Sequence, residues 1–370
     1  MRFAEYTDEW HKYALSDFVT RITRRNKNNE SSLPLTISAQ YGLVDQITFF
    51  NKTVASVDLS GYYLLYNGDF AYNKSYSNDY AWGAVKRLDK YEKGCLSSLY
   101  FVFRPTDKVD SDYLTHYFET SKWHKGISDI AGEGARNHGL LNMAVDDYFA
   151  TKHYLPSLSE QKKIACFLNL ITKRIEIQNK IISKYETLIK GLSYYIIKKF
   201  NGKVYKLGTL AEIYQPQTIT KTDLPDNGKY PVYGANGIIG YYNRFNHKES
   251  QIMITCRGST CGTVNLSTPY SWITGNSMVI NIDEHKSTVD KKYLYYYLKT
   301  QSFNDLISGS GQPQIVRKPL VNLNVFLPEI SQQIKLGEII DIFEKTLKNE
   351  KEMLSALQKQ KAFLLQSMFI

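Results

Sequence analysis

The sequence predicts a mixed α/β protein: two α+β domains separated by two long antiparallel coiled-coil helices, with a pseudo-two-fold internal repeat. Three observations lead to this prediction. A short motif recurs at about half the length of the 370-residue chain. An apolar pattern typical of a long paired helix follows each copy. Runs rich in β-branched and aromatic residues, typical of strands, lie before each copy.

The repeated motif is Leu-Pro-x-x-Ser followed by two acidic or amide residues. It reads LPSLSEQ at residues 155–161 and LPEISQQ at residues 327–333, 172 residues further on. A short polar Gly-x-Gly loop precedes each copy, at residues 132–137 and 309–314. A repeat of this length indicates one structural unit present twice. It divides the chain into a domain at 1–154, a helix at 155–200, a domain at 201–326 and a helix at 327–370.

Both domains are expected to mix strands with short helices. The strand-like runs are residues 97–103 in the first domain and residues 251–255 and 277–282 in the second. Helical stretches are expected near residues 111–120 and 290–299. The pairs Gly68-Asp69 and Asn236-Gly237 indicate turns.

The two long helices are predicted from apolar residues that recur in alternating steps of four and three, the pattern of a coiled-coil seam. Ser159 and Ser331 precede these runs and are expected to cap the helices. Gln178 and Glu350 interrupt the two seams at matched positions. Because the second helix buries its seam only by running back along the first, the pair is expected to be antiparallel. The residues expected to pair are Ile164, Leu168, Ile171, Ile175 and Ile182 in the first helix, and Leu336, Ile340, Phe343, Leu347 and Leu354 in the second.

Composition indicates a polyanionic partner. The chain carries 46 Lys and Arg against 36 Asp and Glu, a formal charge of +10, and it contains 29 Tyr, whose rings suit stacking on bases. No apolar run reaches the ~18 residues of a membrane span, so we expect a cytoplasmic protein without a membrane partner. A zinc site at Cys256 and Cys261 would need two more ligands, and only His247 and His285 lie near them in the sequence, so we expect ordinary reduced thiols.

Motifs for catalysis are missing from the sequence. It has no Gly-x-Gly-x-x-Gly run, no phosphate-binding Gly-Lys-Ser/Thr loop and no Pro-Pro pair of the kind found in amino-methyltransferases. A loose nuclease pattern, Pro225-Asp226 with Glu284–Lys286, falls in polar segments typical of turns. We therefore expect no catalytic residue, no metal and no cofactor in this chain.

Basic, aromatic and amide side chains instead concentrate in loops of both domains. Arg commonly reads guanine and Asn or Gln reads adenine, whereas Lys, Ser and Tyr more often contact phosphates. On this basis the DNA-binding candidates of the first domain are Arg24, Arg25, Tyr72, Asn73, Lys74, Tyr76, Arg136 and Asn137. Those of the second domain are Tyr233, Asn236, Asn243, Arg244, Arg257, Ser259, Gln312 and Gln314.

The doubled Leu-Pro-x-x-Ser-x-Gln motif with its coiled-coil helix resembles the specificity (S) subunit of type I restriction-modification enzymes. Gly-Asp-Phe at 68–70, Gly-Ala-Arg-Asn at 134–137, YPVYGANG at 230–237 and Arg-Gly-Ser at 257–259 are similar to segments of that family. One departure is Gln332, which stands where the family commonly has Glu. The resemblance extends over nearly the whole chain.

This resemblance implies a non-catalytic subunit with two target recognition domains, each reading half of a bipartite, asymmetric site on double-stranded DNA. It also implies that the helices form a spacer and dock two methyltransferase (M) subunits and the motor-nuclease (R) subunits. S-adenosylmethionine, ATP and Mg²⁺ would then belong to those partners. Two other readings stay open at this point: a stand-alone DNA methyltransferase or nuclease, and a structural protein that assembles through its coiled coils.

Overall fold

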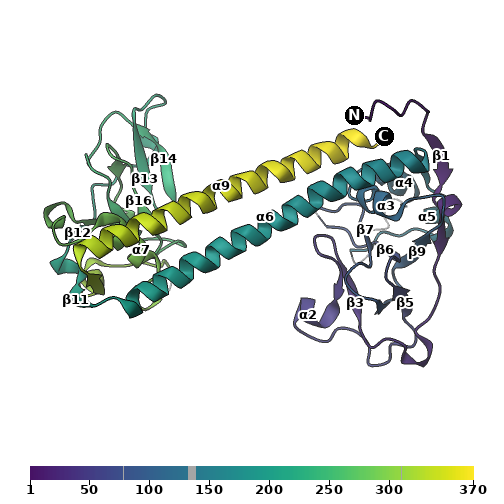
Figure 1. Cartoon of the computed structure of the whole chain (residues 1–370), viewed down its shortest axis with the longest axis horizontal. Helices are drawn as coiled ribbons and strands as arrows, with labels where there is room; N and C mark the ends of the chain where they lie inside the picture. The colour runs from purple at the N-terminus through teal and green to yellow at the C-terminus, as the bar shows by residue number, and fades with distance from the viewer. Residues whose placement is uncertain (78, 132–138, 310) are drawn as a thin grey trace. The chain divides into compact units, whose positions relative to one another are not determined.

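The computed structural model describes residues 1–77, 79–131, 139–309 and 311–370, with the backbone alone at residues 193–199 (Figure 1). The chain forms two compact units. Unit 1 comprises Met1–Gln178 with Leu354–Ile370, and unit 2 comprises Asn179–Met353. The long helices α6 (Leu158–Lys199) and α9 (Ile330–Met368) contribute residues to both units.

Unit 1 is rich in short strands, as the β-branched and aromatic runs predict. Its strands are β1 (His11–Ala14), β2 (Val19–Arg21), β3 (Leu35–Ser38), β4 (Gly42–Asp45), β5 (Tyr63–Tyr66), β6 (Phe70–Asn73), β7 (Ala84–Arg87), β8 (Lys93–Leu96), β9 (Phe101–Pro105) and β10 (Lys152–Leu155). Its short helices are α1 (Leu15–Phe18), α2 (Gln46–Phe50), α3 (Ser111–Tyr117), α4 (His124–Ile130) and α5 (Val145–Ala150).

Unit 2 has a similar composition of elements. Its strands are β11 (Gly202–Lys206), β12 (Glu212–Tyr214), β13 (Tyr230–Gly234), β14 (Gly237–Tyr242), β15 (Ile252–Thr255), β16 (Val264–Leu266), β17 (Trp272–Ile273), β18 (Ser277–Asn281) and β19 (Asn324–Pro328). Its short helices are α7 (Lys291–Lys299) and α8 (Arg317–Val321).

The central sheets of the two units have the same topology. Unit 1 orders its strands β2-β9-β6-β7, and unit 2 orders its strands β12-β18-β15-β16. All neighbours are antiparallel, and the registers also match: Phe70 at the start of β6 lies opposite Phe103, as Ile252 at the start of β15 lies opposite Ile280. The internal repeat of the sequence therefore corresponds to a repeat of the same sheet structure.

A glutamine holds the start of each long helix in the same way. Gln161 accepts a hydrogen bond from the backbone N–H of Asp110 at 2.8 Å and donates to the carbonyl of Pro156 at 2.9 Å. Gln333 accepts from the N–H of Asp290 at 2.9 Å and donates to the carbonyl of Pro328 at 2.8 Å. Both side chains are buried, so each bond replaces water for a backbone group that would otherwise be unpaired.

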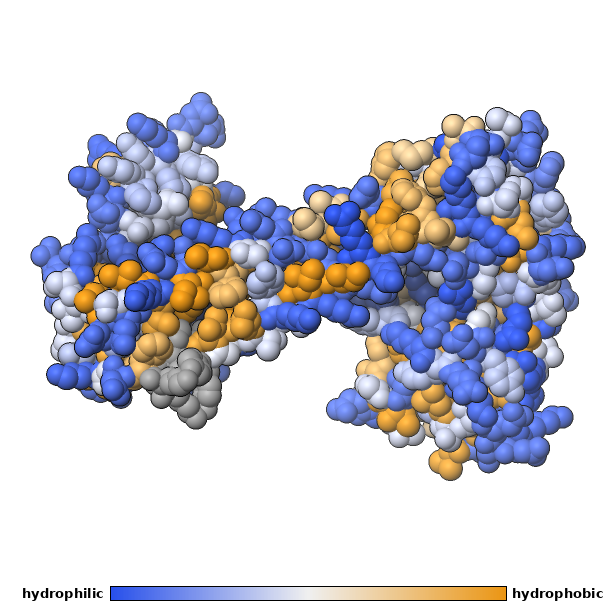
Figure 2. All heavy atoms as spheres, viewed as in Figure 1, coloured by the Kyte–Doolittle hydropathy of each residue, from blue (hydrophilic) through white to orange (hydrophobic). Residues whose placement is uncertain are grey.

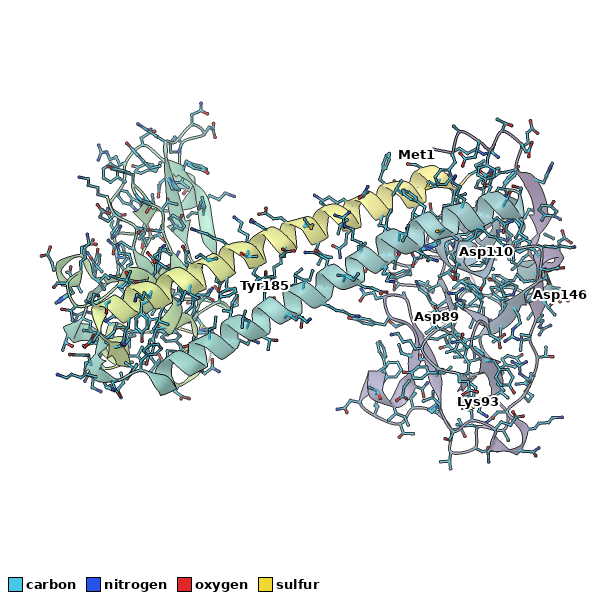
Figure 3. The ribbon with its side chains drawn as sticks, in the orientation of Figure 1. Met1, Asp89, Lys93, Asp110, Asp146 and Tyr185 are labelled. Atoms are coloured by element: carbon cyan, nitrogen blue, oxygen red, sulfur yellow. The ribbon has the colours of Figure 1, made fainter. Side chains whose placement is uncertain are left out.

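Within each unit α6 and α9 run antiparallel. In unit 1 the early residues Ile164 and Leu168 of α6 share one core with the late residues Leu364 and Met368 of α9. In unit 2 the ring of Tyr185, late in α6, lies 6.2 Å from the ring of Phe343, early in α9 (Figure 3). The residues expected to pair are buried or half-buried throughout. The predicted fold class, two α+β domains with two long helices, is confirmed.

The expected caps of the long helices are wrong. Helix α6 begins at Leu158, so Ser159 lies inside the first turn, and the hydroxyl of Ser157 accepts a hydrogen bond from the N–H of Glu160 at 3.4 Å. Helix α9 begins at Ile330, which places Ser331 inside its first turn. Each helix begins two residues after the proline, and the glutamine bond to the proline carbonyl spans this turn.

Both ends of the chain complete unit 1. Phe369 is 2% exposed and its ring lies 5.2 Å from the ring of Tyr113 in α3. At the other end Arg2 forms a bidentate ion pair with the buried carboxylate of Glu160, both distances being 2.7 Å. Phe3 packs edge-on against Phe167 of α6. The first residues of the chain thus cover the start of α6.

Candidate nucleic-acid interface

In unit 1 the loop predicted to contact DNA after β6 pairs with the strand-like segment that follows the first Gly loop. The N–H of Tyr76 donates to the carbonyl of Gly139 at 3.1 Å, and the N–H of Leu141 donates to the carbonyl of Lys74 at 2.9 Å. Ser75 forms an antiparallel bridge with Leu140 between these two bonds. The topology thus brings the Asn73–Tyr76 segment together with residues 139–141, which follow the Gly loop in the sequence.

Unit 2 builds the same frame at the matched place. The N–H of Gly258 donates to the carbonyl of Pro313 at 3.0 Å, and the N–H of Ile315 donates to the carbonyl of Cys256 at 3.0 Å. Arg257 and Gln314 form the bridge between them, as Ser75 and Leu140 do in unit 1. We call these two arrangements the recognition frames: residues 73–76 with 139–141 in unit 1, and residues 255–258 with 313–315 in unit 2.

The recognition frame of unit 2 gathers several of the predicted side chains. Arg257 and Gln314 belong to it, and Ser259 and Gln312 directly adjoin it; all four are exposed. The hydroxyl of Thr260 donates to the side-chain carbonyl of Asn236, which brings the β13–β14 turn to the same place. The result is an exposed surface of one guanidinium and three amides, the groups that read base edges.

The recognition frame of unit 1 carries different side chains. The Asn73 side-chain carbonyl accepts from the N–H of Ser75 at 2.9 Å, which shapes the turn after β6. The Lys74 ammonium lies 4.7 Å from the centre of the Phe101 ring, and partial burial lowers the pKa of this lysine. Tyr76 packs partly buried against the core. The predicted residues Arg136 and Asn137 lie outside the described residues.

Other candidates lie apart from the recognition frames. Asn243 and Arg244 are exposed but follow the end of the β13–β14 hairpin remote from the turn at Asn236. Arg24 and Arg25 lie over the rings of Tyr66 and Tyr63, at 4.2 and 4.4 Å from the ring centres. Unit 1 therefore has a second basic region, around β5 and the start of β6, whereas the recognition frame lies at the other end of β6.

Two predicted aromatic contacts are wrong, because Tyr72 and Tyr233 are core residues. Tyr72 is fully buried, stacks on Tyr148 at 4.8 Å between ring centres and donates to the carbonyl of Trp82. Tyr233 is 8% exposed, and its hydroxyl bonds the N–H of Thr268. The aromatic alternation in β6 has the period of a strand, so it places Phe70 and Tyr72 on the inward face.

Sequence reasoning missed two residues of the second basic region. Asp69 is fully buried, and its carboxylate pairs with Arg24 at 2.9 Å and with Arg104 at 2.6 Å. The signals in the sequence were the Gly68-Asp69 turn and the Gly-Asp-Phe segment at 68–70, which indicate the backbone turn but not the ion pairs. Arg104 lies 35 residues away in β9, and only the strand pairing brings it near.

Comparison with known proteins finds a family model and curated relatives that match part of the chain. A family model described as the type I restriction modification DNA specificity domain matches residues 201–359. The EcoprrI specificity subunit of Escherichia coli is 27% identical over 152 residues, covering 40% of this chain and 37% of that protein. The MjaVIII specificity subunit of Methanocaldococcus jannaschii is 25% identical over 153 residues, covering 38% and 35%. The chain thus matches little more than a third of the length of these curated relatives.

Solved structures extend the likeness to the fold of the whole chain. The S subunit of a type I restriction-modification system from M. genitalium aligns over 100% of this chain and 99% of its own, with a TM-score of 0.65 and 17% identity. A chain from a structure of type I restriction-modification complex assembly aligns over 98% of both, with a TM-score of 0.54 and 16% identity.

Residues 201–359 therefore belong to the family of type I DNA specificity domains. The curated relatives match part of the chain, and the solved structures share the fold of the whole chain. None of the helices in the described ranges combines the length and the hydropathy that crossing a membrane requires.

Proposed function

We propose that the chain is the non-catalytic, cytoplasmic recognition subunit of a type I restriction-modification system, and that its two domains each read half of a bipartite, asymmetric DNA site. The observation that carries this proposal is the recognition frame, built twice on the same backbone bonds with different side chains. Ser75 and Leu140 occupy the bridge in unit 1, and Arg257 and Gln314 occupy it in unit 2. Equivalent frames with unlike side chains suit two unlike half-sites.

The proposal extends to partner proteins through the outer faces of α6 and α9. Apolar side chains remain exposed there although the seam between the helices is filled (Figure 2). Exposed apolar residues of this kind mark protein contacts. They are Leu170, Ile177 and Phe363 in unit 1, and Leu188, Ile339, Ile342 and Met353 in unit 2. Because the repeat provides such a face in each half, two methyltransferase subunits bind per chain, and motor-nuclease subunits join them.

In this proposal the chemistry belongs to the partners. The methyltransferase subunits bring S-adenosylmethionine and methylate an adenine after flipping it out of the duplex. The motor-nuclease subunits bring ATP and Mg²⁺. The chain itself carries the two base-reading surfaces and presents the DNA to the enzymes.

The DNA proposal is tested by comparing the host methylome with and without this gene. Loss of one bipartite adenine methylation pattern on deletion is the expected result, and an unchanged methylome contradicts it. A titration of the purified complex with that site against salt then separates base reading from charge attraction, because binding through phosphates alone falls with salt equally for every sequence.

The partner proposal is tested by light scattering of the co-expressed complex. We expect the mass of one specificity subunit with two methyltransferases. A stable one-to-one mass contradicts the two docking faces. Ile342→Glu in unit 2 and Ile177→Glu in unit 1 should each remove one methyltransferase, whereas exposed Lys348→Glu, also on α9, is the control and should remove none.

A further inference from the structure

The buried carboxylate of Asp69 has no role in the recognition frames, and it is the centre of a second basic region in unit 1. Its side chain is 0% exposed. One oxygen accepts from Arg24 Nη2 at 2.9 Å and from the N–H of Tyr66 at 2.8 Å, and the other accepts from Arg104 Nε at 2.6 Å. One anion thus holds two cations, and a net positive charge remains.

Both guanidinium groups are fixed on one side and open on the other. The side chain of Arg24 is 34% exposed; its Nε donates to the carbonyl of Leu64 at 3.1 Å and its guanidinium lies over the Tyr66 ring. The side chain of Arg104 is 43% exposed. Among the described residues, the hydrogen bonds of both arginines use Nε and Nη2, including one from Arg104 Nη2 to the carbonyl of Asn67 at 3.5 Å, and none uses Nη1. An arginine has five N–H donors, so both groups keep donors for a ligand.

Stability alone is a poor reason for this arrangement. Burying a carboxylate carries a large desolvation cost that ion pairing only offsets, and apolar replacements of buried ion pairs are often as stable. Unit 2 provides the comparison inside the same chain. Gln251 precedes β15 as Asp69 precedes β6, and Asn281 occupies the place of Arg104 in the sheet. The same sheet therefore forms without the acid and without the arginine of β9.

The surroundings favour an anion as the ligand. Arg25 lies next to Arg24 in the sequence and is exposed. Lys93 pairs with Tyr66 in the β5–β8 ladder and is half-buried (Figure 3). The nearby acid is Glu30, which accepts a hydrogen bond from the hydroxyl of Tyr66. Oriented guanidinium groups match the bidentate geometry of phosphate oxygens.

We propose that Asp69 is a positioning residue that holds Arg24 and Arg104 as a paired clamp for the phosphate backbone of DNA bound to the first domain. The inference rests on the proposed DNA-binding function and adds to it a specific asymmetry: unit 1 grips the backbone through a fixed arginine pair, and unit 2 has no equivalent pair at the matched place.

The direction in which one substitution changes the affinity for DNA separates a positioning role of Asp69 from a simple effect of its charge. Asp69→Asn removes a negative charge, so simple charge attraction predicts tighter binding of DNA. The clamp predicts weaker binding, because the two guanidinium groups lose their anchor. The probe is a 30-base-pair duplex pool of mixed sequence, and the measurement is the Kd of the full chain at several salt concentrations. Thermal unfolding of each variant shows whether it folds.

Arginine variants keep the test decisive even where Asp69→Asn fails to fold. For Arg104→Gln we expect the Kd to rise by about tenfold, the loss of one charge-assisted hydrogen bond, and the slope of log Kd against log salt to fall by about 0.9. Arg24→Lys and Arg104→Lys keep the charge but lose the fixed fork, so both should weaken binding nearly as much as the Gln variant.

The matched control is Arg87→Gln, because Arg87 is ion-paired in the same domain but only 17% exposed, with Asp89 and Asp112 as its partners. Its slope should stay that of the wild type. A wild-type chain that binds no duplex overturns the proposed function itself. A wild-type chain that binds, with Arg104→Gln and both Lys variants retaining its Kd and slope, overturns the clamp alone.

Discussion

The two units share a sheet and a helix attachment, yet they attach that helix with opposite chemistry. In unit 1 Asn169 of α6 donates to Asp112 at 2.9 Å and is hydrogen-bonded to His116 at 2.8 Å. In unit 2 Asp341 of α9, at the matched position, accepts from Lys292 at 2.9 Å and from Tyr296 at 3.0 Å. The repeat keeps the place of the contact and changes the groups that make it.

This difference teaches that equivalence of backbone does not make the halves interchangeable. An aspartate in place of Asn169 would face the carboxylate of Asp112, and like charges at that distance repel. The core compositions differ as well: unit 1 contains residues from the far end of the chain, among them Phe369, and unit 1 buries a histidine, His153, where unit 2 buries Val325.

The largest effect should come from removing Phe369. Phe369→Ala deletes a buried ring between Tyr113 and Tyr117 and should lower the free energy of unfolding of unit 1 by about 3–5 kcal/mol. Hydrogen exchange is the measurement, with protection falling in β6 and β9 and unchanged in β15 and β18. Phe363→Ala, at a position 58% exposed, is the control and should change stability by less than about 0.5 kcal/mol. Equal loss in both units would contradict the comparison.

An acid-sensitive difference should follow from His153. Its ring nitrogens bond Tyr117 and Thr151, each at 2.8 Å, and burial lowers the pKa of this histidine from 6.5 to about 4. Between these values the unfolded chain binds more protons than the folded one, so stability falls as pH drops from about 7 to about 4. The loss reaches roughly 3 kcal/mol.

The test of this prediction is His153→Val, which gives unit 1 the residue that unit 2 already has. The free energy of unfolding measured from pH 7 to pH 4 should then depend less steeply on pH. An unchanged pH dependence would show that His153 is not the group that titrates.

A smaller effect, of about 1–3 kcal/mol in binding, is expected for Arg257→Ala if Arg257 reads a base. The Arg257→Ala variant should no longer discriminate between bases in one half of the DNA site, and it should still discriminate in the other half. The measurement is selection of bound duplexes from a pool randomised in both half-sites. Ser75→Ala, at the matched bridge of unit 1, is the control, because it should leave discrimination in the half-site of Arg257 unchanged. A loss that is uniform over all sequences would mark Arg257 as a phosphate contact.

The smallest effect tests the helix attachment directly. Asn169→Asp should destabilise unit 1 by about 1–2 kcal/mol at neutral pH, because the new carboxylate faces Asp112 and loses a hydrogen bond. Adding Asp112→Asn should recover most of the loss, since an amide then donates to the new acid. Urea unfolding measures both. If Asp112→Asn does not restore the stability lost in Asn169→Asp, repulsion between the two carboxylates is not the cause of that loss.

The sequence predicted the parts of the molecule that depend on periodicity. The motif at residues 155–161 and 327–333 located both long helices within three residues, and the steps of four and three identified side chains that the structure buries or half-buries. Strand alternation alone misassigned Tyr72, because period two does not reveal which face is inward. The Asp69–Arg104 contact was beyond reach, since it depends on strand pairing between distant segments.

The position of Phe369 also sets an order of events during synthesis. All residues of unit 2, which ends at Met353, leave the ribosome before the last turns of α9. The first domain to be translated is therefore the last to close its core. Until Leu364, Met368 and Phe369 are made, the residues that pack on Tyr113 and Tyr117 of α3 are missing from the core of unit 1, whereas all residues of unit 2 are already present.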